Sequence, residues 1–460
     1  MKETRDQLRA RIERASVARL SVKSLSLKER LDRLARCGQA FAAHRKELIE
    51  SMVKGERLTR SFAAFQVDQS IGAVEHFESF SELITDHVFE TRAGRTLVRH
   101  DPLGVVALVP PSNSPVRALF LNLGSALLAG NAVVVRPPTA AEATLTLVCE
   151  LVAREWPPGA VEVSSCDATA ARDEFAENKR INAVLFFGGS QIGREYLAAI
   201  SRAQGRRDEL GAEAPLLKKY AAELAGNDAL IVLEDASIGA AVSTTVAGSF
   251  LNSGQTCVAG KRILVHRRVA EPFLDDLVMR VRALRVGDPD DPRVDIGPLG
   301  QQKHVDLLAA LLRDAVAKQG KVLCGGEWDG LVFHPTLIMF DKNVLLGKPE
   351  ADQPRLWTQE SFGPLRSVVI FDDVDEAIRL ADDSRFGLGA CVFGSEQIAL
   401  AIAAQLDVGR VVINGNPVTT AAEVPIGGVR DSGFYGATHK IEDLCYVKRV
   451  FVPANPHRSD

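Results

Sequence analysis

The chain has 460 residues, of which 46% are hydrophobic and 25% are charged, and its formal net charge is −4. This length exceeds what one hydrophobic core normally supports, so we expect two or three structural units. The small net charge gives no electrostatic reason to expect nucleic acid or a membrane surface as a partner. No run of about 18 apolar residues occurs, which argues against a membrane-spanning helix. The charged segment 1–30 lacks an apolar signal core, and this predicts a cytoplasmic protein.

The seven cysteines are odd in number and widely spread. They form no C-x-x-C pair and no Cys/His cluster at zinc spacing, so the sequence predicts neither a disulfide framework nor a metal site.

The first 80 residues have apolar side chains at helical spacing and predict amphipathic helices. Thr91–Thr96 then reads as the turn of a hairpin that extends to about His100. The fully apolar Val105–Val109, bounded by Gly and Pro, is typical of a strand buried in a parallel sheet.

From that strand onward, predicted strands and helices alternate. The sequence predicts helices at 119–128, 140–154, 170–178 and 191–203, and strands at 132–135, 161–164 and 183–187. This alternation predicts a doubly wound α/β sheet with helices on both faces. The polar stretch 204–219 reads as a surface insertion, and a second α/β segment runs from Ala229 to about Asn414. Val447–Val452 is a last strand with no evident partner in its own domain.

Cys257 lies in a stretch of small and polar residues between a predicted helix (Ile238–Phe250) and an apolar strand (Arg262–Val265). A thiol placed between two elements, with glycines on either side, is accessible to solvent and substrate. A thiol also becomes a good nucleophile with only modest help in losing its proton. Most free cysteines are instead small buried core residues, and we expect that role for the other six.

Two further residues are candidates for the same chemistry. Glu223 precedes the predicted strand Ala229–Leu233, where its carboxylate could act as a general base for water; a structural role at the entry of the strand is the alternative. Asn113 directly follows the buried strand Val105–Val109, at the sheet edge where open α/β sheets bind ligands. Its amide could stabilise a developing oxyanion together with the backbone N–H of Cys257, and an Asx-turn before Pro115 is the alternative.

Glycines that follow a predicted strand suggest a phosphate site. Gly188, Gly189, Ser190 and Gly193 lie between the strand Ala183–Phe187 and the start of a helix, a suitable place for a phosphate, although the pattern is not G-x-G-x-x-G.

Several segments together resemble the aldehyde dehydrogenase family from about Arg92 onward. The matching segments are Asn252–Cys257 (N-x-G-Q-x-C), Glu223–Gly226 (E-L-G-G, with Ala225 in place of a glycine), Glu360–Pro364 (E-x-F-G-P) and Pro425–Gly428 with Ser432-Gly433 (P-F-G-G…S-G). The resemblance implies oxidation of an aldehyde to a carboxylic acid through a thiohemiacetal and a thioester on Cys257. Asn113 would hold the oxyanion and Glu223 would activate water.

The same resemblance implies a cofactor site and a domain plan. Pro111, Ser112, Arg136, Thr139, Gly188, Gly189, Ser190, Gly193, Glu360 and Phe362 would bind NAD or NADP. Residues 1–83 and 103–224 would form the Rossmann-like cofactor domain, 225–432 the catalytic domain, and 84–102 with 433–460 an oligomerisation flap. The flap would give the last strand its partner in a neighbouring subunit, in a homodimer or homotetramer.

Two of the departures from the family pattern bear on the cofactor. Ser112 replaces the tryptophan of the P-W-N segment, and the K-P-x-E segment ends in Thr139 in place of glutamate. A glutamate there would repel a 2′-phosphate, whereas Thr139 beside Arg136 tolerates one, so we favour NADP over NAD.

Two alternatives stay open at this point. Ser112 also suggests a CoA-acylating relative, in which a thiol and not water releases the acyl group, and Glu223 argues against that reading. A non-catalytic protein that kept the fold is the other alternative. The sequence does not identify the aldehyde, although Gly226-Asn227-Asp228 loosely resembles relatives that act on small polar aldehydes.

Overall fold

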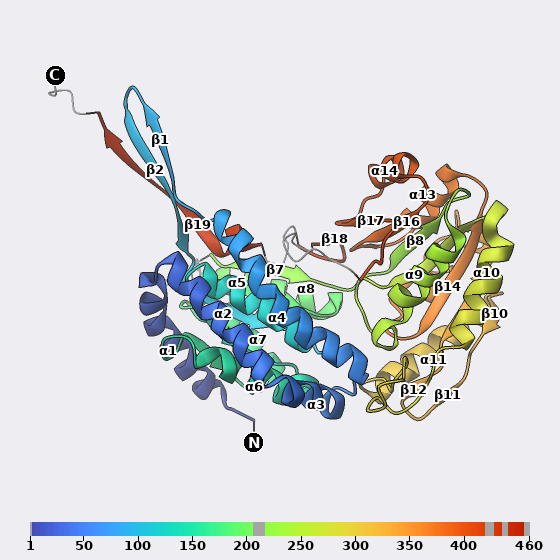
Figure 1. The fold of residues 1–460 in the computed structure, drawn as a ribbon, viewed down its shortest axis with the longest axis horizontal. Helices are drawn as coiled ribbons and strands as arrows, with labels where there is room; N and C mark the ends of the chain where they lie inside the picture. The colour runs from blue at the N-terminus through green and yellow to red at the C-terminus, as the bar shows by residue number, and fades with distance from the viewer. Residues whose placement is uncertain (1, 206–216, 419–426, 435–439, 455–460) are drawn as a thin grey trace.

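A computed structural model describes residues 2–205, 217–418, 427–434 and 440–454. Two α/β bodies lie side by side, each built around its own sheet, and a narrow three-stranded sheet projects away from them (Figure 1). We call these parts the five-stranded body, the seven-stranded body and the flap. The expected architecture of two doubly wound α/β units with a small β extension is therefore present.

The five-stranded body contains a fully parallel sheet, and its central strand β3 (Val105–Val109) is buried along its whole length. Its strand order is β5 (Val161–Val163), β4 (Ala132–Val135), β3, β6 (Ala183–Phe187) and β7 (Lys219–Glu223). One face is covered by α1 (Arg5–Ser24), α7 (Ala168–Glu177) and α8 (Ser190–Gly205). The other is covered by α2 (Leu27–Ala43), α3 (Arg45–Gly55), α4 (Arg60–Glu82), α5 (Pro115–Leu128) and α6 (Glu142–Ala153), with the short η1 (Thr139–Ala141) before α6.

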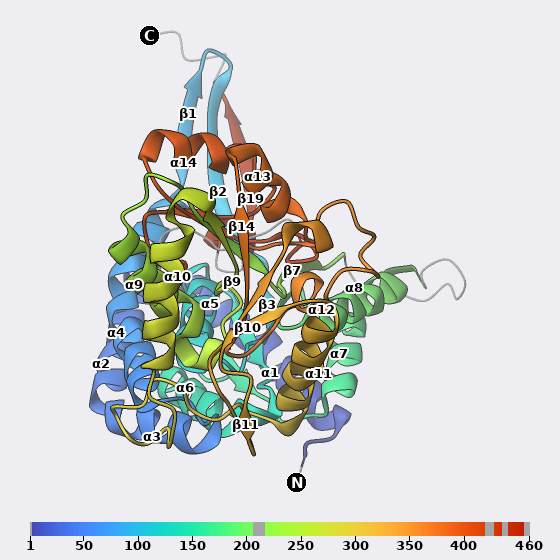
Figure 2. The same cartoon turned by 90° about the vertical axis from the view of Figure 1, so that its right-hand side faces the viewer.

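The seven-stranded body contains a sheet that is parallel except at its β10 edge. Its strand order is β10 (Lys321–Cys324), β13 (Thr336–Phe340), β14 (Leu365–Phe371), β9 (Gly260–His266), β8 (Asp228–Val232), β16 (Ala390–Phe393) and β17 (Val411–Ile413). Helices α9 (Ile238–Phe250) and α10 (Arg267–Arg282) pack on one face. Helices α11 (Gln302–Ala317), α12 (Arg355–Thr358), α13 (Val374–Asp382) and α14 (Glu396–Ala403) pack on the other (Figure 2).

Short elements complete this second body. They are η2 (Leu251–Gly254), η3 (Lys342–Val344) and the two-stranded pairs β11 (Trp328–Asp329) with β12 (Val332–Phe333) and β15 (Phe386–Gly387) with β18 (Val429–Arg430).

The flap is an antiparallel sheet of β1 (His87–Thr91), β2 (Gly94–Pro102) and β19 (Cys445–Pro453), which follows η4 (Ile441–Leu444). The last strand thus pairs with β2 of its own chain, whereas the sequence predicted a partner in a neighbouring subunit. Asp101 of β2 accepts hydrogen bonds from Lys448 of β19 at 2.5 Å and from Lys23 of α1 at 3.0 Å. These contacts fasten the base of the flap to the five-stranded body.

In the five-stranded body, the strands and helices predicted from Val105 onward are confirmed to within four residues, and one strand was missed. Strand β7 (Lys219–Glu223) overlaps the end of the stretch that we read as an insertion, because an edge strand with polar residues has no clear apolar pattern. The rest of that stretch, from 206 to 216, lies outside the described residues. None of the helices in the described ranges is long and apolar enough to cross a membrane.

Candidate active site

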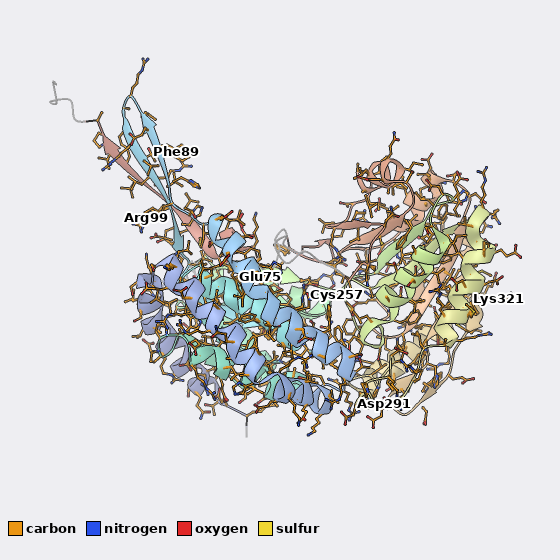
Figure 3. The ribbon with its side chains drawn as sticks, viewed as in Figure 1. Glu75, Phe89, Arg99, Cys257, Asp291 and Lys321 are labelled. Atoms are coloured by element: carbon orange, nitrogen blue, oxygen red, sulfur yellow. The ribbon has the colours of Figure 1, made fainter. Side chains whose placement is uncertain are left out.

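Cys257 lies between η2 and β9, in the seven-stranded body. It is the only one of the seven free cysteines, all in described parts of the chain, that is not buried. Its Sγ donates a hydrogen bond to Oε1 of Glu223, the last residue of β7, at 2.8 Å. Figure 3 shows Cys257 between the two α/β bodies. The fold therefore brings the candidate nucleophile and the candidate base together from different sheets, and Glu223 ends a strand where we expected it in a loop ahead of one.

The turn that presents Cys257 has an unusual backbone. Asn252, Ser253 and Gly254 all have left-handed φ values, of 55°, 54° and 72°. At Gly254 a Cβ atom would lie 2.3 Å from the carbonyl oxygen of Gly363, so only glycine fits there. Three consecutive residues in this region persist only where the surroundings hold them, which is typical of functional sites.

Arg366 of β14 holds this turn. Its side chain is fully buried, and its guanidinium donates to the carbonyl oxygens of Ser249 at 2.9 Å, Gly363 at 2.6 Å and Gly254 at 3.2 Å. Burial lowers the pKa of Arg366 to about 9, so it remains a cation at neutral pH. Sequence analysis missed this residue, although an arginine within an apolar strand is a signal that it has a buried polar role.

Asn113 is positioned beside the nucleophile. Its Nδ2 donates to the carbonyl oxygen of Gln255 at 2.9 Å, and Asn252 Nδ2 donates back to the carbonyl oxygen of Asn113 at 3.0 Å. These two hydrogen bonds join the loop after β3 to the turn before Cys257. An amide nitrogen carries two N–H groups, and the second one of Asn113 could serve an oxyanion formed at Cys257.

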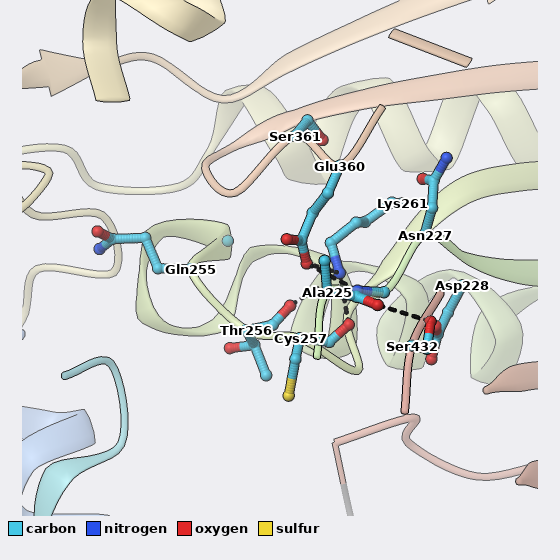
Figure 4. Close-up of polar contacts among 12 residues, drawn as sticks. Ala225, Asn227, Asp228, Gln255, Thr256, Cys257, Lys261, Glu360, Ser361 and Ser432 are labelled. Carbon is cyan, nitrogen blue, oxygen red and sulfur yellow. Dashed lines mark hydrogen bonds and ion pairs between the residues drawn. The ribbon is translucent and has the colours of Figure 1, made fainter. Parts of the chain in front are cut away.

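A buried ion pair lies on the other side of Cys257. Lys261 Nζ donates to the carbonyl oxygens of Thr256 at 3.0 Å and Cys257 at 2.6 Å, and it lies 3.3 Å from Oε1 of Glu360. The same Glu360 oxygen accepts from the backbone N–H of Gly226 at 3.1 Å. Figure 4 shows the Cys257 sulfur pointing away from this cluster. Lys261 was not singled out from the sequence, and its only signal was a lysine at the start of an apolar strand.

Burial sets the electrostatics of the site. It raises the pKa of Glu223, and a hydrogen bond from Cys257 opposes this shift. Burial, and then the charge of Glu223, raises the pKa of the Cys257 thiol well above its ordinary value. Burial also raises the pKa of Glu360, against the charge of Lys261. The Cys257 thiol and the Glu223 carboxylate are therefore direct partners, and a proton can pass from one to the other without an intervening group.

Segments that are distant in sequence contact the residues that follow Glu223. The Ser432 hydroxyl donates to the carbonyl oxygen of Ala225 at 2.6 Å and accepts from the N–H of Gly387 at 3.0 Å (Figure 4). Leu224 N–H donates to the carbonyl oxygen of Ser432 at 2.9 Å. The predicted Ser432-Gly433 segment thus contacts the Glu223–Gly226 segment directly. Pro425 and Ile426 of the same motif lie outside the described residues.

The predicted cofactor residues of the five-stranded body lie at one edge of its sheet. Pro111 and Ser112 follow β3, and Arg136 follows β4, where its Nε donates to the carbonyl oxygen of Cys166 at 3.2 Å. Thr139 begins η1 and is exposed. Because the carboxyl ends of parallel strands share an edge, these side chains lie on the side where Glu223 ends β7.

The glycine turn after β6 has two different parts. Gly188 and Gly189 lie between β6 and α8, and a Cβ at Gly189 would meet no atom within 4 Å, so its surroundings are open. Ser190 begins α8, and its hydroxyl donates to the carbonyl oxygen of Asp431 at 2.7 Å. Gly193 lies inside α8, where a Cβ would be 2.4 Å from a Leu224 methyl carbon. The structure thus gives Gly193 a role in close helix packing and Gly188 a close contact with the Phe186 ring, 2.8 Å from where a Cβ would lie, while Gly189 leaves room for a phosphate.

The remaining predicted cofactor residue, Phe362, is partly exposed, and its ring centroid lies 6.4 Å from that of His304. Across the described residues, no group of three or more His, Cys, Asp or Glu side chains could hold a metal ion.

Comparison with known proteins adds independent findings. Residues 1–450 match the model of the aldehyde dehydrogenase family. The chain is 28% identical over 459 residues to lactaldehyde dehydrogenase of Methanococcus maripaludis, covering 97% of this chain and 93% of that protein. It is 35% identical over 368 residues to the NAD(+) benzaldehyde dehydrogenase of Pseudomonas putida, covering 78% and 71%. The crystal structure of NADP-dependent glyceraldehyde-3-phosphate dehydrogenase from Bacillus halodurans, complexed with NADP, is similar with a TM-score of 0.88 at 25% identity, covering 98% and 92%.

Proposed function

Because this chain belongs to the aldehyde dehydrogenase family, we propose that it oxidises its aldehyde through Cys257, with Glu223 as the base and Asn113 as the oxyanion donor. The observation that carries this assignment is the 2.8 Å hydrogen bond from the Cys257 thiol to the Glu223 carboxylate. A nucleophile within hydrogen-bond reach of a base is the arrangement that covalent catalysis requires.

The first half of the reaction uses all three residues. Glu223 takes the proton of the Cys257 thiol, and the sulfur attacks the carbonyl carbon of the aldehyde. The carbonyl π electrons move to oxygen, and this oxyanion accepts hydrogen bonds from the Asn113 amide and the backbone N–H of Cys257. One such donor lowers the barrier by about 3 kcal/mol. The product of this step is a thiohemiacetal on Cys257.

A nicotinamide cofactor held at this site would supply the oxidising chemistry, as the acceptor of the hydride from the carbon attached to sulfur. The chain is then left with a thioester on Cys257. Glu223 releases its first proton to solvent and takes one from a water, whose oxygen attacks the thioester carbon; it then returns this proton to the departing sulfur. The carbon–sulfur bond breaks, the carboxylic acid leaves, and the Cys257 thiol is restored.

We assign the cofactor site to the edge formed by the loops after β3, β4 and β6, together with Glu360 and Phe362. The open position at Gly189, just before α8, suits a pyrophosphate. The neutral Thr139 and the cation Arg136 favour NADP over NAD. The relatives reported above include an NAD(+) enzyme and an NADP complex, so these two residues decide our preference.

The domain plan follows from the same assignment. Residues 1–83 and 103–224 would be the cofactor domain, 225–432 the catalytic domain, and 84–102 with 433–460 the flap.

Apolar side chains are exposed on the flap, where Figure 3 labels Phe89, and they suit burial in a homodimer or homotetramer. They are Val88, Phe89, Tyr446, Val447, Val450, Phe451 and Val452. Seven cysteines without a disulfide suit a reducing compartment, and we propose the cytoplasm.

The test is a spectrophotometric assay of the purified protein with aldehydes and NADP or NAD, without CoA. Reduced cofactor should appear with the wild-type protein and not with Cys257→Ala. Asn113→Ala should lower kcat by about 100-fold. The matched control Cys324→Ala, in β10, should keep activity. A strict requirement for CoA would favour the CoA-acylating alternative, and alkylation of Cys257 by iodoacetamide no faster than that of the buried cysteines would favour a non-catalytic protein.

A further inference from the structure

Lys261 is an enclosed cation whose three donors all meet acceptors. It lies near the start of β9 and is 1% exposed. Its ammonium donates to the carbonyl oxygens of Thr256 and Cys257, at 3.0 and 2.6 Å, and lies 3.3 Å from the carboxylate of Glu360. Pairing with Glu360 explains how a lysine can be buried here. It does not explain why two of the three donors go to the peptide groups of the nucleophile.

The contact with Thr256 fixes the direction of the Cys257 N–H. The carbonyl of Thr256 and the N–H of Cys257 belong to one peptide unit, and in a trans peptide these two groups point in opposite directions. The Thr256 oxygen accepts from Lys261 and also from the backbone N–H of Ala259, at 3.2 Å. The Cys257 N–H must therefore point away from Lys261. Figure 4 shows the Cys257 sulfur pointing away from the same cation.

The peptide that follows Cys257 is held by the same side chain. The carbonyl oxygen of Cys257 accepts from Lys261, and it lies so close to Gly226 that a Cβ there would be 2.6 Å away. The Gly226 N–H donates to the Glu360 oxygen that pairs with Lys261, at 3.1 Å. Neither peptide beside Cys257 can rotate without losing a hydrogen bond to Lys261.

The proposed oxyanion site needs two donors that converge on one oxygen, the Asn113 amide and the Cys257 N–H. Asn113 lies against the same turn, where its Nδ2 donates to the carbonyl oxygen of Gln255 at 2.9 Å. The Cys257 N–H belongs to the backbone, so its direction is set by how its peptide is held. A donor stabilises a developing oxyanion fully only when it is oriented before the reaction.

The charge of Lys261 offers a different role, which the contacts do not favour. Burial and the charge of Glu223 raise the pKa of the Cys257 thiol, and the charge of Lys261 opposes them. A cation that served only the thiolate would best face the sulfur. Lys261 instead meets carbonyl oxygens, while the sulfur points away from it (Figure 4).

We propose that Lys261 is a positioning residue for the oxyanion, because it holds the peptide before Cys257 so that the Cys257 N–H points to the carbonyl oxygen of the substrate. Without Lys261 this peptide is free to turn, and the oxyanion keeps only the Asn113 amide. The inference rests on the proposed function, since it takes the reacting carbonyl oxygen to lie between these two donors.

The test compares two reactions of Cys257 that need the same thiolate and differ in the oxyanion. In p-nitrophenyl acetate the sulfur attacks the carbonyl carbon, an oxyanion develops, and p-nitrophenolate leaves. In iodoacetamide it attacks a saturated carbon, iodide leaves, and no oxyanion forms. The ratio of the two rates at one pH cancels the thiolate fraction, and neither reaction uses a nicotinamide. Lys261→Met should lower the rate with the ester by about 100-fold relative to alkylation, after subtraction of the Cys257→Ala rates.

Lys218→Met is the matched control. Lys218 is also buried, and its ammonium also donates to two carbonyl oxygens, those of Asn178 and Ile181. It lies just before β7, at the opposite end of that strand from the site. Its ratio of rates should equal that of the wild type, whereas Asn113→Ala should lower the ratio as Lys261→Met does.

A second pair of variants covers the case in which Lys261→Met does not fold. Lys261→Met combined with Glu360→Gln, compared with Glu360→Gln alone, leaves no buried charge unpaired, and the ester needs no cofactor. An unchanged ratio would overturn the proposal: if both rates fall together, Lys261 acts on the thiolate, and if neither falls, it only stabilises the fold. A lower ratio in a protein that reduces no cofactor with any aldehyde would refute the proposed function and leave the role of Lys261 standing.

Discussion

Replacing Glu223 by glutamine separates two effects of this carboxylate on Cys257. The substitution keeps the size of the side chain and removes both its charge and its ability to accept a proton. Its negative charge opposes formation of the thiolate, whereas its basicity is needed to carry the thiol proton away. We therefore expect Glu223→Gln to make the thiol more acidic and the enzyme much slower.

The structure gives the size of the first effect. Two unit charges at the 2.8 Å separation of Sγ and Oε1 interact with about 6 kcal/mol at an effective dielectric constant of about 20, which corresponds to about four pKa units. Burial raises the pKa of Glu223, so we take the full interaction of two unit charges as an upper bound. We expect the pKa of Cys257 to fall by at least about one unit in the variant. Loss of the base should lower kcat by about 100- to 10,000-fold.

Two assays measure these effects. The pH dependence of iodoacetamide alkylation, followed by mass spectrometry of the Cys257 peptide, gives the thiol pKa. Stopped-flow absorbance of reduced cofactor separates the first turnover, up to the thioester, from steady-state turnover. In the wild type, kcat/KM should rise with pH through the raised pKa of Glu223, because the base acts as a carboxylate, and this limb should be absent in Glu223→Gln. The exposed Glu234→Gln is the matched control. A thiol pKa that stays the same or rises in Glu223→Gln would refute the reasoning.

Three further predictions concern the cofactor, the turn and the flap. Thr139→Glu should lower kcat/KM for NADP by about tenfold or more relative to NAD, because the new charge repels the 2′-phosphate; initial rates with both cofactors measure this. Gly254→Ala should abolish activity and cost at least about 2 kcal/mol of stability, since the left-handed backbone and the carbonyl of Gly363 exclude a Cβ; thermal unfolding measures it. Burial would raise the pKa of Asp101, but hydrogen bonds from two lysines outweigh it and lower the pKa to about 2. Asp101→Asn should therefore cost about 2 kcal/mol at neutral pH, seen as a lower Tm.

Each of these predictions has a clear contrary result. An unchanged NADP to NAD ratio in Thr139→Glu would place the adenosine ribose elsewhere. Gly300→Ala, where a Cβ meets no atom within 4 Å, is the control for the turn, and equal effects of both alanines would contradict the steric argument. The stabilisation by Asp101 is fully present above the unfolded pKa of about 3.9 and is lost as the pH falls through about 2. A Tm difference from Asp101→Asn that persists below pH 2 would contradict the charge argument.

The fold could be predicted from the sequence wherever burial produces a continuous apolar pattern. Strands β3, β4 and β6 are buried on both faces, and each was predicted with the bounds that the structure has. The edge strand β7 was missed because only its two alanines are buried, which gives no apolar pattern, and two of its five side chains are charged. Glu223 was therefore recognised as a candidate but was assigned to a loop.

The sequence brought forward the three candidate residues of the proposed site but not the residues that support them. Cys257, Glu223 and Asn113 stood out because their residue types have chemistry of their own. Lys261 and Arg366 act by holding carbonyl oxygens of loops far away in sequence, and no local spacing encodes such partners.

The pairing of β2 with β19 has a consequence for biosynthesis. More than 300 residues separate these strands, so the ribosome must make the entire seven-stranded body before the hairpin of β1 and β2 can receive its third strand. During that interval the free side of β2 exposes unpaired backbone groups between apolar side chains, which is a template for unwanted association of nascent chains. The two lysines that donate to Asp101 lie near opposite ends of the polypeptide, Lys23 and Lys448. Both hydrogen bonds can therefore form only after translation has passed Lys448.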